Sequence, residues 1–256
     1  MQILRIIFSV LFILGGSLTF LSAQERSASE LIDEANKLLR GQSSHSEMTM
    51  TISTPKWERK LAIEAWNQGR EKSLMRIHSP AKERGNGTLK ISKELWNWLP
   101  AVERVIKIPP SMMNSSWMGS DFTYNDVVKA DSVVKDYTHK ILEKKFQKDG
   151  TMYLIEALPK EEAAVVWGKI LMEIFEQGQD ILPVKEEDYS ERGEKMRTLE
   201  FLEVKEMSGK RIPTHVECTP HKKVGHKTVI TYKKFETDLT FQPHFFSLKT
   251  LQRPLE

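Results

Sequence analysis

Most of the chain alternates apolar and polar side chains with a period of two, the pattern of β-strands covered on one face. Examples are RKLAIEAW, TMYLIEAL, RTLEFLEVKEM and KTVITYKKF, each rich in β-branched and aromatic residues. Turn dipeptides that end in glycine separate these stretches, and the last four such glycines stand at 178, 193, 209 and 225. Their even spacing, without repetition of sequence, predicts successive long hairpins and about eleven to thirteen strands in a meander.

Two segments depart from the strand pattern and are predicted to be helical. Ser27 and Glu30 form a capping box, and Gly41 ends a helix over residues 27–40. One stripe of that helix is apolar and consists of Leu31, Ile32, Ala35, Leu38 and Leu39. The helix is therefore expected to lie on an apolar surface. The second segment is YNDVVKADSVVKD, residues 124–136.

Several predicted strands are apolar on both faces. In VVWGKILMEIF, one face has Ile170, Met172 and Ile174, and the other has Trp167, Leu171 and Phe175. Each of two apolar faces has to be covered by another part of the protein. The predicted helices are short for covering so wide a sheet. A sandwich, in which the second face is covered by the other half of the sheet, is the alternative.

The first 23 residues have the layout of a secretory signal peptide. Arg5 precedes an apolar run from Ile6 to Leu14, and Ala23 offers a small residue for cleavage. We therefore expect export to the periplasm and one mature domain over residues 24–256; an uncleaved membrane anchor is the alternative. Without Arg5 the net charge falls from +3 to +2, and the basic residues are scattered, so nothing indicates nucleic-acid binding. A single cysteine, Cys218, excludes an internal disulfide.

Residues 108–123, IPPSMMNSSWMGSDFT, combine turn-forming residues with large apolar ones. Turn residues keep a segment at the surface, whereas apolar side chains normally leave it. Either the loop tucks under the protein or a hydrophobic molecule lies beneath it. The large apolar side chains are Met112, Met113, Trp117, Met118 and Phe122.

Stretches at 95–123, 165–174, 198–214, 226–236 and 245–254 make the chain resemble the outer membrane lipoprotein-sorting proteins of the LolA-like superfamily. The resemblance implies a mainly β (α+β) fold: an unclosed antiparallel β-barrel, or half-barrel, with a few covering helices and a hydrophobic cavity between sheet and helices. It also implies a carrier of acylated cargo through the periplasm. Relatives of this kind often accompany RND-type exporters.

On this basis the loop is expected to be a hinged flap over an acyl chain, because each buried CH₂ contributes about 0.8 kcal/mol. Its ligand contacts would be Met112, Met113, Trp117, Met118 and Phe122, with Trp96 and Trp98 near the cavity rim. The alternative is that these side chains fill an ordinary hydrophobic core. Three rim charges, Arg104, Lys107 and Asp121, would contact a headgroup or a partner; otherwise they are solvated strand ends.

The sequence thus predicts a monomeric periplasmic carrier or chaperone, not an enzyme, that moves lipid or acylated lipoprotein from an inner-membrane exporter toward an outer-membrane acceptor. The alternative is an accessory interaction subunit of an RND-type exporter without its own cargo. A hydrolase would need a buried Ser–His pair, and no motif of that kind is present. The cluster of Glu217, Cys218, His221 and His226 matches no standard zinc spacing, so we expect neither metal nor cofactor.

Overall fold

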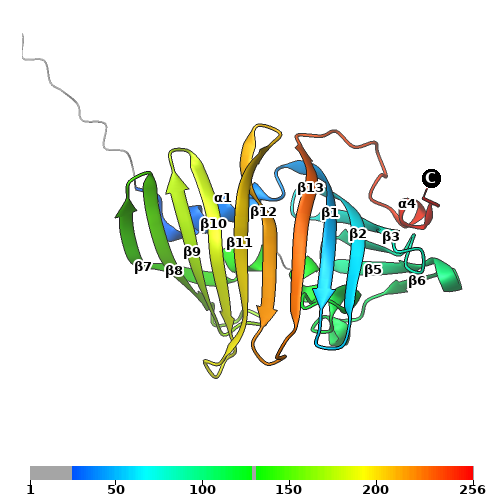
Figure 1. Ribbon diagram of the computed structural model, residues 1–256, viewed down its shortest axis with the longest axis horizontal. Helices are drawn as coiled ribbons and strands as arrows, with labels where there is room; N and C mark the ends of the chain where they lie inside the picture. Colours follow the sequence, from blue (N-terminus) through cyan, green and yellow to red (C-terminus); the bar gives the residue numbers. More distant parts are fainter. Residues whose placement is uncertain (1–24, 129–130, 256) are drawn as a thin grey trace, which may run out of the picture.

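A computed structural model describes residues 25–128 and 131–255 (Figure 1). The predicted signal peptide lies outside them. The described part contains thirteen strands, as predicted: β1 (Ser43–Ser53), β2 (Glu58–Gln68), β3 (Lys72–Ser79), β4 (Gly87–Ile91), β5 (Glu94–Leu99), β6 (Arg104–Lys107), β7 (Tyr137–Gln147), β8 (Gly150–Pro159), β9 (Lys169–Gln177), β10 (Asp180–Tyr189), β11 (Lys195–Met207), β12 (Lys210–Pro220) and β13 (Lys227–Thr237). The helices are α1 (Ala28–Leu38), α2 (Tyr124–Val128), α3 (Ser132–Lys135) and α4 (Leu248–Gln252).

All these strands belong to one antiparallel sheet that is not closed, in the order β6-β5-β4-β3-β2-β1-β13-β12-β11-β10-β9-β8-β7. Two meanders, β1–β6 and β7–β13, therefore meet where β1 pairs with β13. Because β6 and β7 lie at opposite edges, the chain between them has to cross the sheet. We call residues 108–128, which begin this passage and include α2, the crossing segment, and the sheet face that it covers the inner face. The predicted half-barrel is confirmed, and a two-sheet sandwich is wrong.

Helix α1 covers the inner face of the β7–β10 half and lies behind these strands in Figure 1. It begins as predicted: the Ser27 hydroxyl accepts from the Glu30 amide, while the Glu30 carboxylate accepts from the Ser27 amide. Its buried residues are Ala28, Leu31, Ile32 and Ala35. No helix in the described ranges is long and apolar enough to cross a bilayer.

The inner face has two apolar core clusters. One joins α1 to the inner face of β7–β10, through residues such as Leu31, Ile155 and Ile174. The other lies under the crossing segment and joins Met50, Leu61 and Ile77 of β1–β3 to Trp117 and Tyr124. The helices and the crossing segment thus supply the inner covering that the sequence requires.

A third cluster covers part of the opposite, outer face. The chain after β13, which includes α4, places Phe245, Phe246 and Leu251 against Leu74 and Leu89. The C-terminal segment lies beside β3 in Figure 1. The outer covering of this half of the sheet is therefore made by the chain itself. On the β7–β8 side, by contrast, Leu142, Phe146 and Leu158 are exposed.

Candidate functional site

A half-open cavity of about 350 Å³ lies between the two inner clusters. Strands β1–β3, β9–β11 and β13 form its floor, and α1, α2 and the crossing segment border it. Much of the wall is apolar, with three methionines and three other large side chains: Met48, Met75, Met172, Leu199, Phe201 and Ile230. Flexible thioethers suit a ligand without fixed shape, because methionine repacks at little cost.

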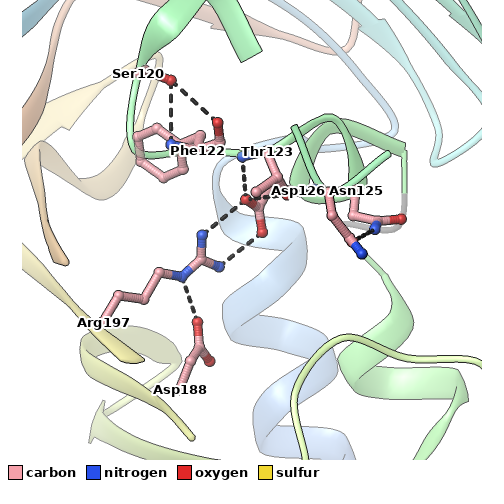
Figure 2. A network of polar contacts seen from close by, with 8 residues as sticks. Ser120, Phe122, Thr123, Asn125, Asp126, Asp188 and Arg197 are labelled. Atoms are coloured by element: carbon pink, nitrogen blue, oxygen red, sulfur yellow. Dashed lines mark hydrogen bonds and ion pairs between the residues drawn. The ribbon is translucent and has the colours of Figure 1, made fainter. Parts of the chain in front are cut away.

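A buried ion cluster centred on Arg197 borders the cavity, whose lining includes Arg197 and Asp126 (Figure 2). The Arg197 guanidinium donates from Nη1 and Nη2 to the two Asp126 oxygens, each at 2.8 Å, and from Nε to Asp188 Oδ2 at 2.6 Å. The Arg197 side chain is only 7% exposed. Asp126 is also held at the start of α2 by the amide and hydroxyl of Thr123. The cluster therefore fastens α2 to β10 and β11.

The three acids in and beside this cluster, Asp126, Asp188 and Glu186, differ in how readily they ionise. Burial opposes the charge of Asp126, but the nearby Arg197 outweighs it and lowers the pKa of this carboxyl. Burial, reinforced by the charge of Asp188, raises the pKa of Glu186 to about 8. Burial also raises the pKa of Asp188, whose Oδ1 is buried and has no hydrogen-bond partner in the described ranges. Glu186 thus borders the cavity as a carboxyl group that favours its neutral form.

This raised pKa predicts a pH-dependent stability. A neutral Glu186 contributes stability in full below its unfolded pKa, near 4.5, and loses it as pH rises through about 8. The glutamine side chain of Glu186→Gln cannot ionise. We therefore expect the free energy of unfolding of this variant to fall less than that of the wild type between pH 5 and pH 8. Urea unfolding at several pH values measures this difference. Glu200→Gln, at an exposed position of β11, serves as the control; parallel pH profiles for wild type and Glu186→Gln would contradict the assignment.

Specific contacts fasten the crossing segment over the cavity. Trp117 Nε1 donates to Thr88 Oγ1 at 3.2 Å, and a chain of hydrogen bonds continues from Thr88 to Asn97 at 3.0 Å. Asn97 in turn donates to the Tyr124 hydroxyl at 2.8 Å. A tight turn with positive φ at Met118 (51°) and at Gly119 follows Trp117. These contacts fasten the crossing segment to β4 and β5, and its role as a flap stays a prediction.

The predicted ligand-contact residues lie in three places. Trp117 and Phe122 line the cavity. Met113 and Met118 pack against the inner cluster beneath the crossing segment, whereas Met112 is 43% exposed. Ligand contact by these five residues stays a prediction.

The predicted rim residues lie away from the cavity wall. Trp96 and Trp98 pack in the outer-face cluster. Arg104 and Lys107 are exposed on β6, where Lys107 pairs with Glu94. Asp121 accepts from the Thr228 hydroxyl at 2.8 Å and lies 3.6 Å from the Lys223 ammonium. None of these five is among the lining residues in the described part of the chain.

Reasoning from sequence missed the charged residues of the cavity: Arg40, Asp126 as an ion-pair partner, Glu186 and Arg197. One signal was available, because Arg197 alternates in phase with Leu199 and Phe201 and thus shares their face.

Known proteins share this architecture. A family model described as an uncharacterized, DUF1329-like protein matches residues 69–253. No curated protein matches the chain.

Among solved structures, a DUF1329 family protein from Desulfovibrio piger is similar, with a TM-score of 0.77 and 20% identity over 88% of this chain and 98% of its own. A LolA superfamily protein from Nitrosomonas europaea has a TM-score of 0.72 and 21% identity over 88% of this chain and 100% of its own. A domain from Vibrio parahaemolyticus assigned to outer membrane lipoprotein sorting has a TM-score of 0.74 and 19% identity, over 88% and 98%. These similarities establish the fold.

Proposed function

Because the chain belongs to the DUF1329-like family and has the LolA-like fold, we propose that it is a carrier that binds acyl chains of lipids or lipoproteins in its inner cavity. The observation that supports this function best is the cavity itself, about 350 Å³ between the sheet and its helices. Pockets for small molecules span about 300 to 1,000 Å³ and are mostly apolar. The cavity therefore suits part of an acyl chain, and further opening of the crossing segment would admit more.

The energetics favour an acyl ligand. Each CH₂ removed from water contributes about 0.8 kcal/mol, so ten such groups contribute on the order of 8 kcal/mol before the costs of binding. Met48, Met75 and Met172 offer side chains that adapt to a mobile chain. A ligand of this kind gains affinity from the apolar area that it buries rather than from a fixed shape. Binding of this kind suits a carrier that passes its ligand to another protein.

The biological setting is part of the proposal. With residues 1–23 as a signal peptide, the protein acts in the periplasm as a monomer and chaperone. It receives lipid or acylated lipoprotein at the inner membrane, next to an RND-type exporter, and delivers it to an outer-membrane acceptor. An accessory role on the exporter without cargo is the second candidate, and the exposed Leu142, Phe146 and Leu158 near the β7 edge favour it.

A titration with a fluorescent acyl probe that brightens in apolar surroundings separates the two candidates. A carrier is expected to bind the probe saturably at one per protein and to release it when a diacyl phospholipid or an acylated peptide is added. The absence of saturable binding, together with capture of a detergent-solubilised RND exporter by the pure protein, would favour the accessory role instead.

A further inference from the structure

Arg40 borders the cavity, and its guanidinium has no partner in the described part of the chain. It follows the C-cap residue of α1, Leu39, and its side chain is among the lining residues. Within residues 25–128 and 131–255, its guanidinium makes no hydrogen bond and no ion pair. Arg197, which also lines the cavity, is by contrast paired with two aspartates. An unpaired guanidinium that has lost part of its hydration is unfavourable unless an anion joins it.

Tyr232 of β13 lies close enough to Arg40 to feel its charge and lines the same cavity. In the described ranges, the Tyr232 hydroxyl likewise has no hydrogen-bond partner. A guanidinium offers a planar fork of N–H donors that fits a carboxylate or phosphate, and a phenol adds one O–H donor. Two donors that are unused in the described ranges therefore border the same largely apolar cavity.

The surroundings of Arg40 have an excess of positive charge. Lys90, only 2% exposed, lies near enough to interact electrostatically with Arg40, and it donates to the Arg70 carbonyl oxygen at 2.7 Å. Burial is the main reason why the pKa of Lys90 is lowered to about 8, and the charge of Arg40 adds to it. The acid that acts on both cations, Asp131, is already paired with Lys135 at 2.6 Å.

We propose that Arg40 and Tyr232 bind the oxyanion of an amphiphile, a carboxylate or a phosphate, whose acyl chain occupies the cavity. This inference rests on the proposed function and deepens it, because it assigns the ligand to the anionic amphiphiles. The part of the lining around Arg197 is unsuitable for an anion, because Asp126 and Asp188 already neutralise Arg197 and Glu186 adds a third carboxyl group. The ligand is thus oriented with its headgroup near the end of α1.

The test compares amphiphiles with the same chain and different headgroups: dodecanoate, dodecyl phosphate and dodecanol, each displacing a fluorescent acyl probe. The wild type is expected to prefer at least one anion over the alcohol by about 10- to 100-fold, the range of a charge-assisted hydrogen bond. The anion with the higher affinity shows whether the natural ligand is a fatty acid or a phosphorylated lipid. Equal affinities for all three ligands would overturn the inference while leaving the acyl carrier intact, whereas no binding of any of them would overturn the carrier itself.

Three variants assign the preference to Arg40. Arg40→Gln is expected to lose the preference for the anion while its affinity for dodecanol stays within about threefold, because only the charged contact is removed. Arg40→Lys is expected to keep part of the preference. Arg104→Gln, at the exposed β6 position, is the matched control and is expected to bind like the wild type. Retention of the full preference in Arg40→Gln, or its loss in Arg104→Gln, would contradict the assignment.

Thermal unfolding without ligand provides a second readout. Arg40→Gln removes an unpaired cation, so its melting temperature is expected to equal or exceed that of the wild type by a few degrees. A structural role for Arg40 would lower the melting temperature instead. A lower melting temperature together with loss of dodecanol binding would overturn the proposed role.

Discussion

Ala65→Phe is expected to abolish acyl binding while leaving the protein folded. Ala65 lies on β2, is 3% exposed, lines the cavity and is paired with Met75 of β3. A phenyl ring at this position projects into the volume that an acyl chain would occupy. We expect the affinity for a fluorescent acyl probe to fall by more than about 100-fold, since a few excluded CH₂ groups are worth that much.

The stability of Ala65→Phe should change little, because the ring fills space that is empty instead of forcing apart a packed core. Ala62→Phe is the matched control: it lies on the same strand, on the opposite face of the sheet. This variant is expected to bind the probe like the wild type. Equal binding by Ala65→Phe and Ala62→Phe, with both proteins folded by circular dichroism, would place the ligand elsewhere.

Arg197→Met is expected to lower the free energy of unfolding by about 3–5 kcal/mol. The loss is large because Asp126 and Asp188 remain buried without the guanidinium that compensates them. Their mutual repulsion should also loosen α2 from β10 and β11. Urea unfolding at neutral pH measures the change.

Two further variants separate the buried charge from other effects of Arg197→Met. Arg211→Met breaks an exposed pair with Asp180 and is expected to cost less than about 1 kcal/mol. A triple variant, Arg197→Met with Asp126→Leu and Asp188→Leu, should recover most of the stability, because well-packed apolar groups can replace a buried ion cluster. A loss below about 1 kcal/mol for Arg197→Met alone would show that the cluster does not fasten α2.

The sheet could be predicted because its determinants are local. Alternation and glycine turns fix the position of each strand, and the capping box of Ser27 and Glu30 fixes the start of α1. The pairing of β1 with β13 could not be obtained in this way, because it joins residues that are far apart in sequence. That pairing puts β6 and β7 at opposite edges and so sends the crossing segment over the inner face.

The inward-facing acids of β10 escaped prediction because of a β-bulge. In β10 the register shifts between Pro183 and Lys185. Strict alternation from Ile181 and Pro183 would place Lys185 on the inner face; the bulge places Glu186 and Asp188 there instead. A bulge of this kind leaves no mark in a simple alternating pattern.

The orientation of the tryptophans of β5 likewise depends on contacts with residues that are distant in sequence. Trp96 and Trp98 were predicted to lie near the cavity rim, yet they face outward and pack against the cluster that includes the C-terminal segment. Between them Asn97 faces inward, where Thr88 and Tyr124 satisfy its amide. Burial on the outer face could not be anticipated without knowing where the C-terminal segment lies.

Native mass spectrometry of the protein, isolated without detergent from a Gram-negative periplasm, tests the acyl-filled cavity most directly. We expect a population that is heavier than the mature chain by the mass of one acyl-containing molecule. This molecule dissociates on collisional activation, is identified after organic extraction and is missing from Ala65→Phe. Wild-type protein that shows only the mass of the bare chain, and whose extracts contain no fatty acyl groups, would contradict this expectation.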